Sequence, residues 1–203
     1  MTLTLYWGSA SPFVRKVMAV AHELGIDADI QIRNTAAHPV DRDLSIQAVN
    51  PLAKVPAAQT GDGTKLYDSR VICEYLDSLH GGGLFPAPGP ARWTALRRQA
   101  LADGLLDAAL LIRYETLIRP EPQRWPLWID KQREKLFDAL AAMNDDLPDD
   151  GCHDIGAIAY GCALGWLSFR FPDLDWRGPH PAMADWHAAF DTRPAMSATR
   201  PFA

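Results

Sequence analysis

The sequence predicts an α/β domain at its amino-terminal end, followed by an all-α domain. Two observations lead to this fold class. Strand and helix patterns alternate up to about residue 85, and every periodic segment after that point has helical spacing. Between the two lies LFPAPGPAR (84–92), a short stretch rich in proline and glycine that is typical of a linker. We therefore expect an α/β domain over residues 1–80, a linker over 81–90 and an all-helical domain over 91–203.

The α/β part begins as a strand, a helix and a second strand. Alternating, β-rich residues predict strands in TLTLYW (2–7) and in ADIQIRN (28–34). Between them, apolar residues recur at helical spacing from Pro12 onward, and Gly25 is a natural end for that helix. Strand, helix and strand joined by short links predict a βαβ unit with a right-handed crossover.

A hairpin and one more helix complete the α/β part. KVPAAQT and TKLYDS flank a Gly-Asp-Gly turn at residues 61–63, which is a hairpin signal. Pro56 stands at the entry of the third strand, where a proline does not interrupt a ladder, and the bond before it is a candidate for the cis form. SRVICEYLDSLHGG predicts a helix with one apolar side, which the glycines at 81–83 end.

The second half contains four helical patterns. They cover residues from about 91 to 118, from about 125 to 143, from 154 to 171 and from about 181 to 191. The third pattern carries no charge between Asp154 and Arg170 and is apolar on nearly every face. Such a helix is expected to be buried among its neighbours, and its glycines would allow them to approach closely.

Composition excludes several classes of function. The net charge of -5 argues against a nucleic-acid partner, which requires a basic face. No apolar run approaches the roughly 20 residues that span a membrane, and MTLTLYWG does not look like a signal peptide, so no membrane partner is expected. The odd number of cysteines, 3, and the absence of C-x-x-C suit a reducing cytoplasm. H-E-x-x-H is also absent, and we expect no metal site.

Ser11 is the first candidate for chemistry. Serine is a favoured N-cap and Pro12 is favoured at the first helical position, so capping alone explains Ser11. Ser11 also follows a strand that enters the sheet centre, at the end of the sheet where α/β sites gather. A hydroxyl there can donate to an anion. If the anion were a thiolate, the pKa of the thiol would fall below the roughly 8.5 of a free thiol. Ser9, in the same loop, is a rival for this role.

Two further segments are candidates for ligand binding. Asp68 and Ser69 end a strand and open a helix, which fits either a helix cap or a site for an α-amino acid head-group. In the second role Asp68 would pair with the ammonium group. In NPLAKVP (50–56), the main chain of Val55 beside a cis proline would offer an N–H and a C=O to an extended peptide. Lys54 either holds a second carboxylate or simply faces solvent.

The chain resembles the glutathione transferase superfamily. The resemblance rests on SPFVRKV (11–17), NPLAKVP (50–56) and DSRVICEYL (68–76), in that order, and on the helical second half. It is nearest to serine-type bacterial members and to the plant tau class, which share the S-P-F motif. The resemblance implies a thioredoxin-like domain that binds glutathione and an all-α domain that walls an electrophile pocket.

The resemblance also implies roles for single residues. Ser11 is implied to stabilise the thiolate, and Val55 before a cis Pro56 to pair with the cysteinyl main chain. Asp68 and Ser69 would anchor the γ-glutamyl group. The implied glutathione-binding residues are Phe13, Lys54, Val55, Pro56, Asp68 and Ser69. Tau-type chains usually have glutamate where this chain has Asp68. Members of the family usually have a serine or threonine cap before the buried helix. That position is Gly151 in this chain, which leaves Asp154 as an acid in the first turn.

One face of the predicted helix from about 91 to 118 is the candidate for the electrophile pocket. Asp103, Asp107 and Tyr114 share one helix face, and unpaired carboxylates are costly to bury, so they either face solvent or take partners. We expect this stripe to face the active site, although ordinary core and rim packing explains each residue equally well. The predicted electrophile pocket consists of Trp7, Asp103, Asp107, Leu111 and Tyr114, with Phe13 as a further candidate.

The predicted function is therefore addition of the glutathione thiolate to a small hydrophobic electrophile. Glutathione would be the co-substrate. The resemblance implies a homodimer, and the cysteine usage favours a cytoplasmic location. Serine at position 11 removes mixed-disulfide chemistry at that site. One alternative is a non-catalytic binding or stress-response protein on the same scaffold. Another is a glutathione-dependent isomerase, dehalogenase or peroxidase.

Overall fold

The computed structural model describes residues 3–202 and divides them into two compact units. One unit holds the chain up to Ala87 together with the segment from Arg193 onward, and the other is Pro88–Thr192. The sequence had assigned everything after residue 90 to the helical domain. The structure corrects this for the last segment, because helix α8 (Pro194–Ala198) packs against α1 (Pro12–Glu23) in the first unit.

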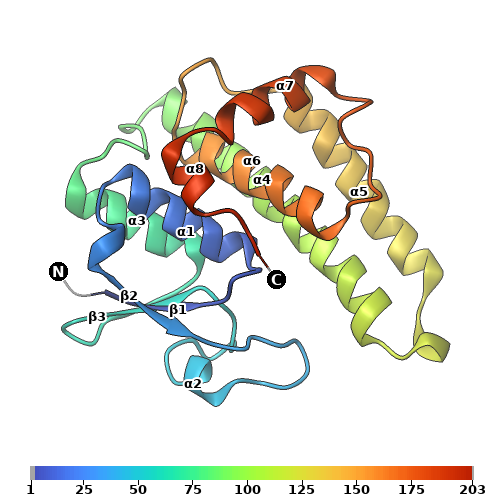
Figure 1. Ribbon diagram of the computed structural model, residues 1–203, viewed down its shortest axis with the longest axis horizontal. Helices are drawn as coiled ribbons and strands as arrows, with labels where there is room; N and C mark the ends of the chain where they lie inside the picture. Colours follow the sequence, from blue (N-terminus) through green and yellow to red (C-terminus); the bar gives the residue numbers. More distant parts are fainter. Residues whose placement is uncertain (1–2, 203) are drawn as a thin grey trace. The chain divides into compact units, whose positions relative to one another are not determined.

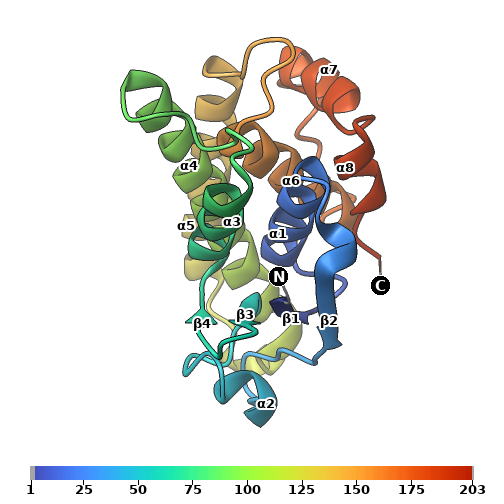
Figure 2. The ribbon, with the colours of Figure 1, turned by 90° about the vertical axis from the view of Figure 1, so that its left-hand side faces the viewer.

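The first unit is a mixed sheet with helices on its two faces. Its elements are β1 (Leu3–Trp7), α1, η1 (Asp27–Asp29), β2 (Ile30–Asn34), α2 (Leu44–Gln47), β3 (Ala57–Thr60), β4 (Lys65–Leu66), α3 (Ser69–His80) and α8. The strand order is β2-β1-β3-β4. α1 and α3 cover one face of the sheet and α2 lies on the other side (Figures 1 and 2).

The register of the sheet follows the predicted βαβ unit and hairpin. β1 runs parallel to β2, with Leu3 opposite Ile30, and antiparallel to β3, with Leu5 opposite Ala58. β3 and β4 form the antiparallel hairpin. This arrangement confirms the thioredoxin-like unit. Because β1 is central, its carboxyl end places the following loop, which contains Ser11, at the middle of the sheet edge.

Two short α-helices in this unit were not predicted. Asp43 caps α2, its Oδ1 accepting the N–H of Ser45 at 2.8 Å. The α8 segment is held by an ion pair of Arg193 with Glu23, whose two N–O distances are both 3.0 Å. Helices of one turn are unstable alone. The cap of α2 is local in the sequence, whereas the ion pair that holds the α8 segment joins residues far apart, which a local pattern does not show.

The second unit is all helix, as predicted. Its elements are α4 (Pro90–Arg113), η2 (Tyr114–Ile118), η3 (Glu121–Gln123), α5 (Pro126–Asp145), α6 (Ile155–Arg170) and α7 (Pro181–Phe190). η2 is a π-helical turn, so the predicted long helix changes its winding after Arg113. α4 packs against both α5 and α6.

α6 is the buried helix that its composition predicted. Every residue from Ile155 to Leu164 is buried. At Gly156 the helix approaches α4 so closely that an added Cβ would lie 2.8 Å from the carbonyl oxygen of Ala95. The expected cap was wrong, however. Asp154 is the N-cap itself, and its Oδ1 accepts the N–H of Ala157 at 2.9 Å.

Candidate functional site

Ser11 is the N-cap of α1, and its side chain turns back to the helix. Its Oγ accepts the main-chain N–H of Val14 at 3.3 Å, and its own N–H donates to the carbonyl of Gly8 at 3.1 Å. A hydroxyl that accepts one hydrogen bond still has its proton to donate. The capping and thiolate roles, which the sequence left as alternatives, are therefore compatible in one side chain.

The loop of Ser11 lies beside the segment that leads into β3. An added Cβ on Gly8 would stand 3.9 Å from Cγ2 of Val55, so the two segments are neighbours within the first unit. Ser9 and Ser11 belong to this same loop, and both stay candidates for contact with a thiol.

Val55 presents its main chain as the sequence predicted. The Val55–Pro56 peptide bond is cis. Within residues 3–202, neither the N–H nor the C=O of Val55 is paired with another protein group. An extended peptide could therefore pair with both groups.

Asn50 holds this segment in shape and was missed by sequence reasoning. Its side-chain amide donates to the carbonyl of Lys54 at 2.9 Å, and its Oδ1 accepts the N–H of Leu52 at 3.1 Å. Asn50 is only 2% exposed, and Ala53 between these partners has a left-handed φ of 53°. Lys54 itself is exposed. The available signal was the asparagine that opens the NPLAKVP motif.

Asp68 and Ser69 stand at the start of α3. Asp68 is an exposed N-cap whose Oδ1 accepts the N–H of Arg70 at 2.9 Å, which leaves further lone pairs of the carboxylate for a cation. Ser69 is buried in the first turn, where helix N–H groups favour an anion. The peptide bond before Asp68 is also cis.

The predicted pocket residues fall into both units. Trp7 is in the first unit, where its ring lies 5.8 Å from that of Phe202, a neighbour that sequence reasoning missed. Asp103, in the second unit, is 2% exposed, whereas Asp107 and Tyr114 reach the surface. The residues on this helix face therefore differ in exposure. The electrophile pocket itself stays a prediction.

Phe13, a further side chain of the predicted site, is half-buried in the first turn of α1. The ammonium of the buried Lys16 lies 5.9 Å from the centre of its ring. Phe13 therefore lies in the helix turn that Ser11 caps.

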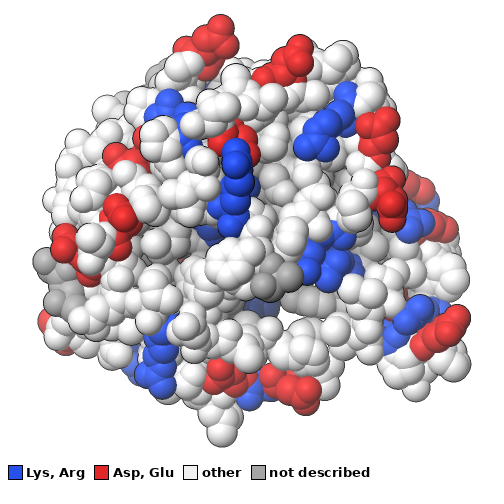
Figure 3. Space-filling model, viewed as in Figure 1, with Lys and Arg blue, Asp and Glu red and all other residues white. Residues whose placement is uncertain are grey.

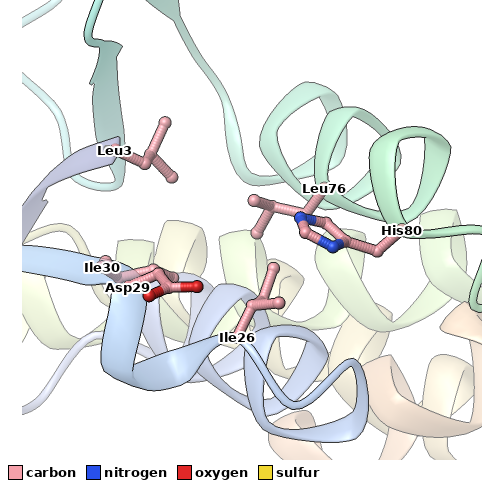
Figure 4. A pocket seen from close by; sticks show the side chains of 6 residues that line it. All are labelled: Leu3, Ile26, Asp29, Ile30, Leu76 and His80. Carbon is pink, nitrogen blue, oxygen red and sulfur yellow. The ribbon is translucent and has the colours of Figure 1, made fainter. Parts of the chain in front are cut away.

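A small pocket elsewhere in the first unit is separate from this site (Figure 4). It is lined by Leu3, Ile26, Asp29, Ile30, Leu76 and His80. Leu3 begins β1, whereas the loop of Ser11 follows the end of that strand, so the pocket lies at the opposite end of the central strand.

Surface charge, possible metal ligands and possible membrane-spanning helices also bear on the predictions. Figure 3 shows acidic and basic side chains interspersed on one face. In the part of the chain from 3 to 202, no three or more His, Cys, Asp or Glu side chains are placed to hold a metal ion. No helix in that part is long and apolar enough to cross a bilayer.

These features define a two-part protein built from a thioredoxin-like unit and an all-helical unit. Residues 10–79 match the family model of the glutathione S-transferase N-terminal domain, and residues 126–189 match that of the glutathione S-transferase C-terminal domain. The uncharacterized GST-like protein YibF of Escherichia coli (strain K12) is 30% identical over 94% of this chain and 95% of its own. The chain belongs to the glutathione S-transferase family.

Solved structures agree with this assignment. A glutathione transferase family member from Pseudomonas fluorescens Pf-5, with bound glutathione, is 43% identical, has a TM-score of 0.94 and is matched over 100% of both chains. A second structure of a family member from the same organism, with bound S-(propanoic acid)-glutathione, has 43% identity and a TM-score of 0.89, covering 99% of this chain and 100% of that one.

Proposed function

We propose that this protein is a glutathione transferase in which the hydroxyl of Ser11 stabilises the glutathione thiolate. The observation that carries the proposal is the cap of α1, where Ser11 Oγ accepts the Val14 N–H and keeps its own proton to donate. The glutathione and S-substituted glutathione bound by the relatives from Pseudomonas fluorescens support the choice of ligand.

The chemical step needs a thiolate at neutral pH. A free thiol has a pKa of about 8.5, and a donated hydrogen bond together with the positive end of a helix lowers it. The thiolate sulfur then forms a bond to an electrophilic carbon, the bond to the leaving group breaks and that group departs with the electron pair. The thiol proton has already passed to solvent. Most of the catalysis is thus positioning and stabilisation of the anion.

The rest of the tripeptide is assigned to groups in the same unit. The unpaired N–H and C=O of Val55 would pair with the cysteinyl main chain. Asp68 would hold the γ-glutamyl ammonium, while Ser69 and the first amides of α3 would hold its carboxylate. Lys54 would meet the glycyl carboxylate. Phe13 and Pro56 would border the ligand.

The second substrate is proposed to be a small hydrophobic electrophile. Trp7, Asp103, Asp107, Leu111 and Tyr114 are the residues proposed to line its pocket. A homodimer, which the family resemblance implies, and a cytoplasmic location, which the cysteine usage favours, belong to the same proposal. Sedimentation of the purified protein would test the dimer.

Ser11→Ala is the variant that tests the proposal. The pKa of the bound glutathione thiol, measured by the ultraviolet absorbance of the thiolate, should rise by about one to two units, while affinity for glutathione is kept. Ser11→Thr keeps the hydroxyl and the cap, so its thiol pKa should stay low. Ser9→Ala is the matched control and should behave as the parent does.

Two results would contradict the proposal. An unchanged thiol pKa in Ser11→Ala would remove Ser11 from the mechanism, and a raised pKa in Ser9→Ala would transfer the role to Ser9. Retention on immobilised glutathione without turnover of any halogenated aromatic would favour a non-catalytic binding protein.

A further inference from the structure

Three arginines gather where α4 and α6 end. Arg113 is the last residue of α4, Arg170 is the last residue of α6, and Arg177 follows in the next loop. Arg113 Nη1 donates to the carbonyl of Arg170 at 3.3 Å, and Arg177 Nη2 donates to Ser168 Oγ at 2.9 Å. Within residues 3–202, no Asp or Glu forms an ion pair with any of these three guanidinium groups.

Other arginines of the same unit do have acidic partners. Arg98 donates two hydrogen bonds to the carboxylate of Asp146, from Nε at 3.2 Å and from Nη2 at 3.0 Å. Arg119 Nε donates to Oε2 of Glu115 at 2.7 Å. Arg113, Arg170 and Arg177 therefore differ from Arg98 and Arg119, because no carboxylate of the described residues neutralises them.

Contacts within the protein use only part of the positive charge and of the hydrogen-bond donors of these arginines. A helix carboxyl end carries about half a negative charge, and the bond from Arg113 to the last carbonyl of α6 uses one of its five donors. Burial lowers the pKa of Arg113, and the nearby charge of Arg170 lowers it further. The two cations therefore repel each other, and an anion between them would relieve that repulsion.

Aromatic rings lie next to the two arginines. The guanidinium of Arg170 stands 4.2 Å from the centre of the Phe169 ring. Tyr114, the residue after Arg113, is 38% exposed. Burial raises the pKa of the Tyr114 phenol, so it is neutral at neutral pH and does not repel an anion. These rings offer an apolar surface beside the cations.

We propose that Arg113 and Arg170 bind the carboxylate of a small aromatic acid. Arginine is the side chain best suited to a planar carboxylate, which it can bind through two parallel hydrogen bonds. On the function proposed above, on which this part rests, the electrophile is then an acidic aromatic compound. With 4-chloro-3-nitrobenzoate as the probe, the thiolate forms the C–S bond, the C–Cl bond breaks, chloride leaves with the electron pair and the carboxylate is unchanged.

Binding of an unreactive pair of ligands tests the site by itself. 3-Nitrobenzoate and its methyl ester differ in the charge, and neither has a leaving group. Calorimetry on the full chain should give at least about tenfold tighter binding of the acid, because hydrogen bonds to a charged group have about that effect. Arg113→Gln, which keeps a donor for the Arg170 carbonyl, and Arg170→Gln should both lose this preference.

Arg133→Gln is the matched control. Arg133 lies on α5, is 57% exposed in its side chain and is 3.8 Å from Asp130. It should keep the full preference for the acid. Equal binding of acid and ester by the parent protein would overturn the proposal, and so would an unchanged preference in both Arg113→Gln and Arg170→Gln.

Turnover separates this proposal from the proposed function. The ratio of kcat/KM for 4-chloro-3-nitrobenzoate to that for its methyl ester should fall about tenfold or more in Arg113→Gln. Preferred binding of the acid without any turnover would support the carboxylate site and contradict the transferase function. Turnover of both compounds with no preference in binding would support the transferase function and contradict the carboxylate site.

Discussion

The side-chain amide of Asn50 donates a hydrogen bond to the main-chain carbonyl of Lys54, 2.9 Å away, one residue before the exposed main chain of Val55. This bond, with the one from Leu52 N–H to Asn50 Oδ1, closes the loop before the cis proline. The buried side chain of Asn50 therefore ties two points of this loop together.

Removing that side chain should loosen the loop. We expect Asn50→Ala to lower the free energy of unfolding by about 1–3 kcal/mol, because buried partners are left unpaired. Affinity for glutathione, measured by calorimetry, should fall about tenfold, because Val55 is no longer held for pairing. An unchanged affinity would show that the loop is held in place without Asn50.

Asp154 caps the buried helix α6. Replacing it with alanine removes the acceptor of the Ala157 N–H. Asp154→Ala should cost about 1 kcal/mol in urea unfolding, and Asp154→Ser should recover most of the loss. Because the cap is in the helical unit, Asp154→Ala is also the control for Asn50→Ala: it should destabilise without weakening glutathione binding. A variant as stable as the parent would contradict the capping role.

Gly156 is where α6 meets α4 most closely. An added Cβ would lie 2.8 Å from both the carbonyl oxygen of Ala95 and the Cβ of Arg98, neither of which moves easily. Gly156→Ala should lower the free energy of unfolding by about 1–3 kcal/mol, even though alanine favours helix.

Gly104 on α4 provides the matched control, since an added Cβ there meets nothing within 4 Å. Gly104→Ala should be neutral or more stable by up to about 1 kcal/mol. Equal effects of the two substitutions on thermal unfolding would show that helix propensity, and not the close approach, governs both sites.

Glu115 joins the end of α4 to the start of α5. Its Oε1 accepts the N–H of Trp125 at 2.8 Å, and its Oε2 accepts from Arg119 at 2.7 Å. The hydrogen bond from Trp125, and then the one from Arg119, holds the pKa of Glu115 below its ordinary 4.5. A lowered pKa in the folded state means that the ionised carboxylate stabilises the fold above pH 4.5, and that this stabilisation is lost as pH falls through the folded value.

Glu115→Gln should therefore unfold at a lower temperature than the parent at pH 7, with the difference shrinking as the pH falls below 4.5. Melting curves of both proteins between pH 7 and pH 3 would measure this. A difference that stayed constant across that range would mean that the charge of Glu115 contributes nothing to stability.

Local patterns predicted most of the larger elements. The alternation in TLTLYW, the helical spacing after Pro12 and the glycine that ends α3 at position 81 all appear in the structure. The sequence also proposed the Ser11, Val55 and Asp68 segments as parts of the candidate site, and their roles stay a prediction. The α8 helix was not predicted, and Asp154, expected in the first turn of α6, is its N-cap, because the periodicity of a segment does not fix short helices or exact helix ends.

By itself, the sequence determined the two-part architecture, the buried character of α6 and the residues that carry the family resemblance. These follow from periodicity and from backbone limits of proline and glycine, which act within a few residues. Only the tertiary structure decided that Asn50 supports Lys54, that the last segment joins the first unit and that Arg113 meets Arg170 without an acid. Those pairs lie at helix ends or in loops, and their contacts exist only once distant segments have packed.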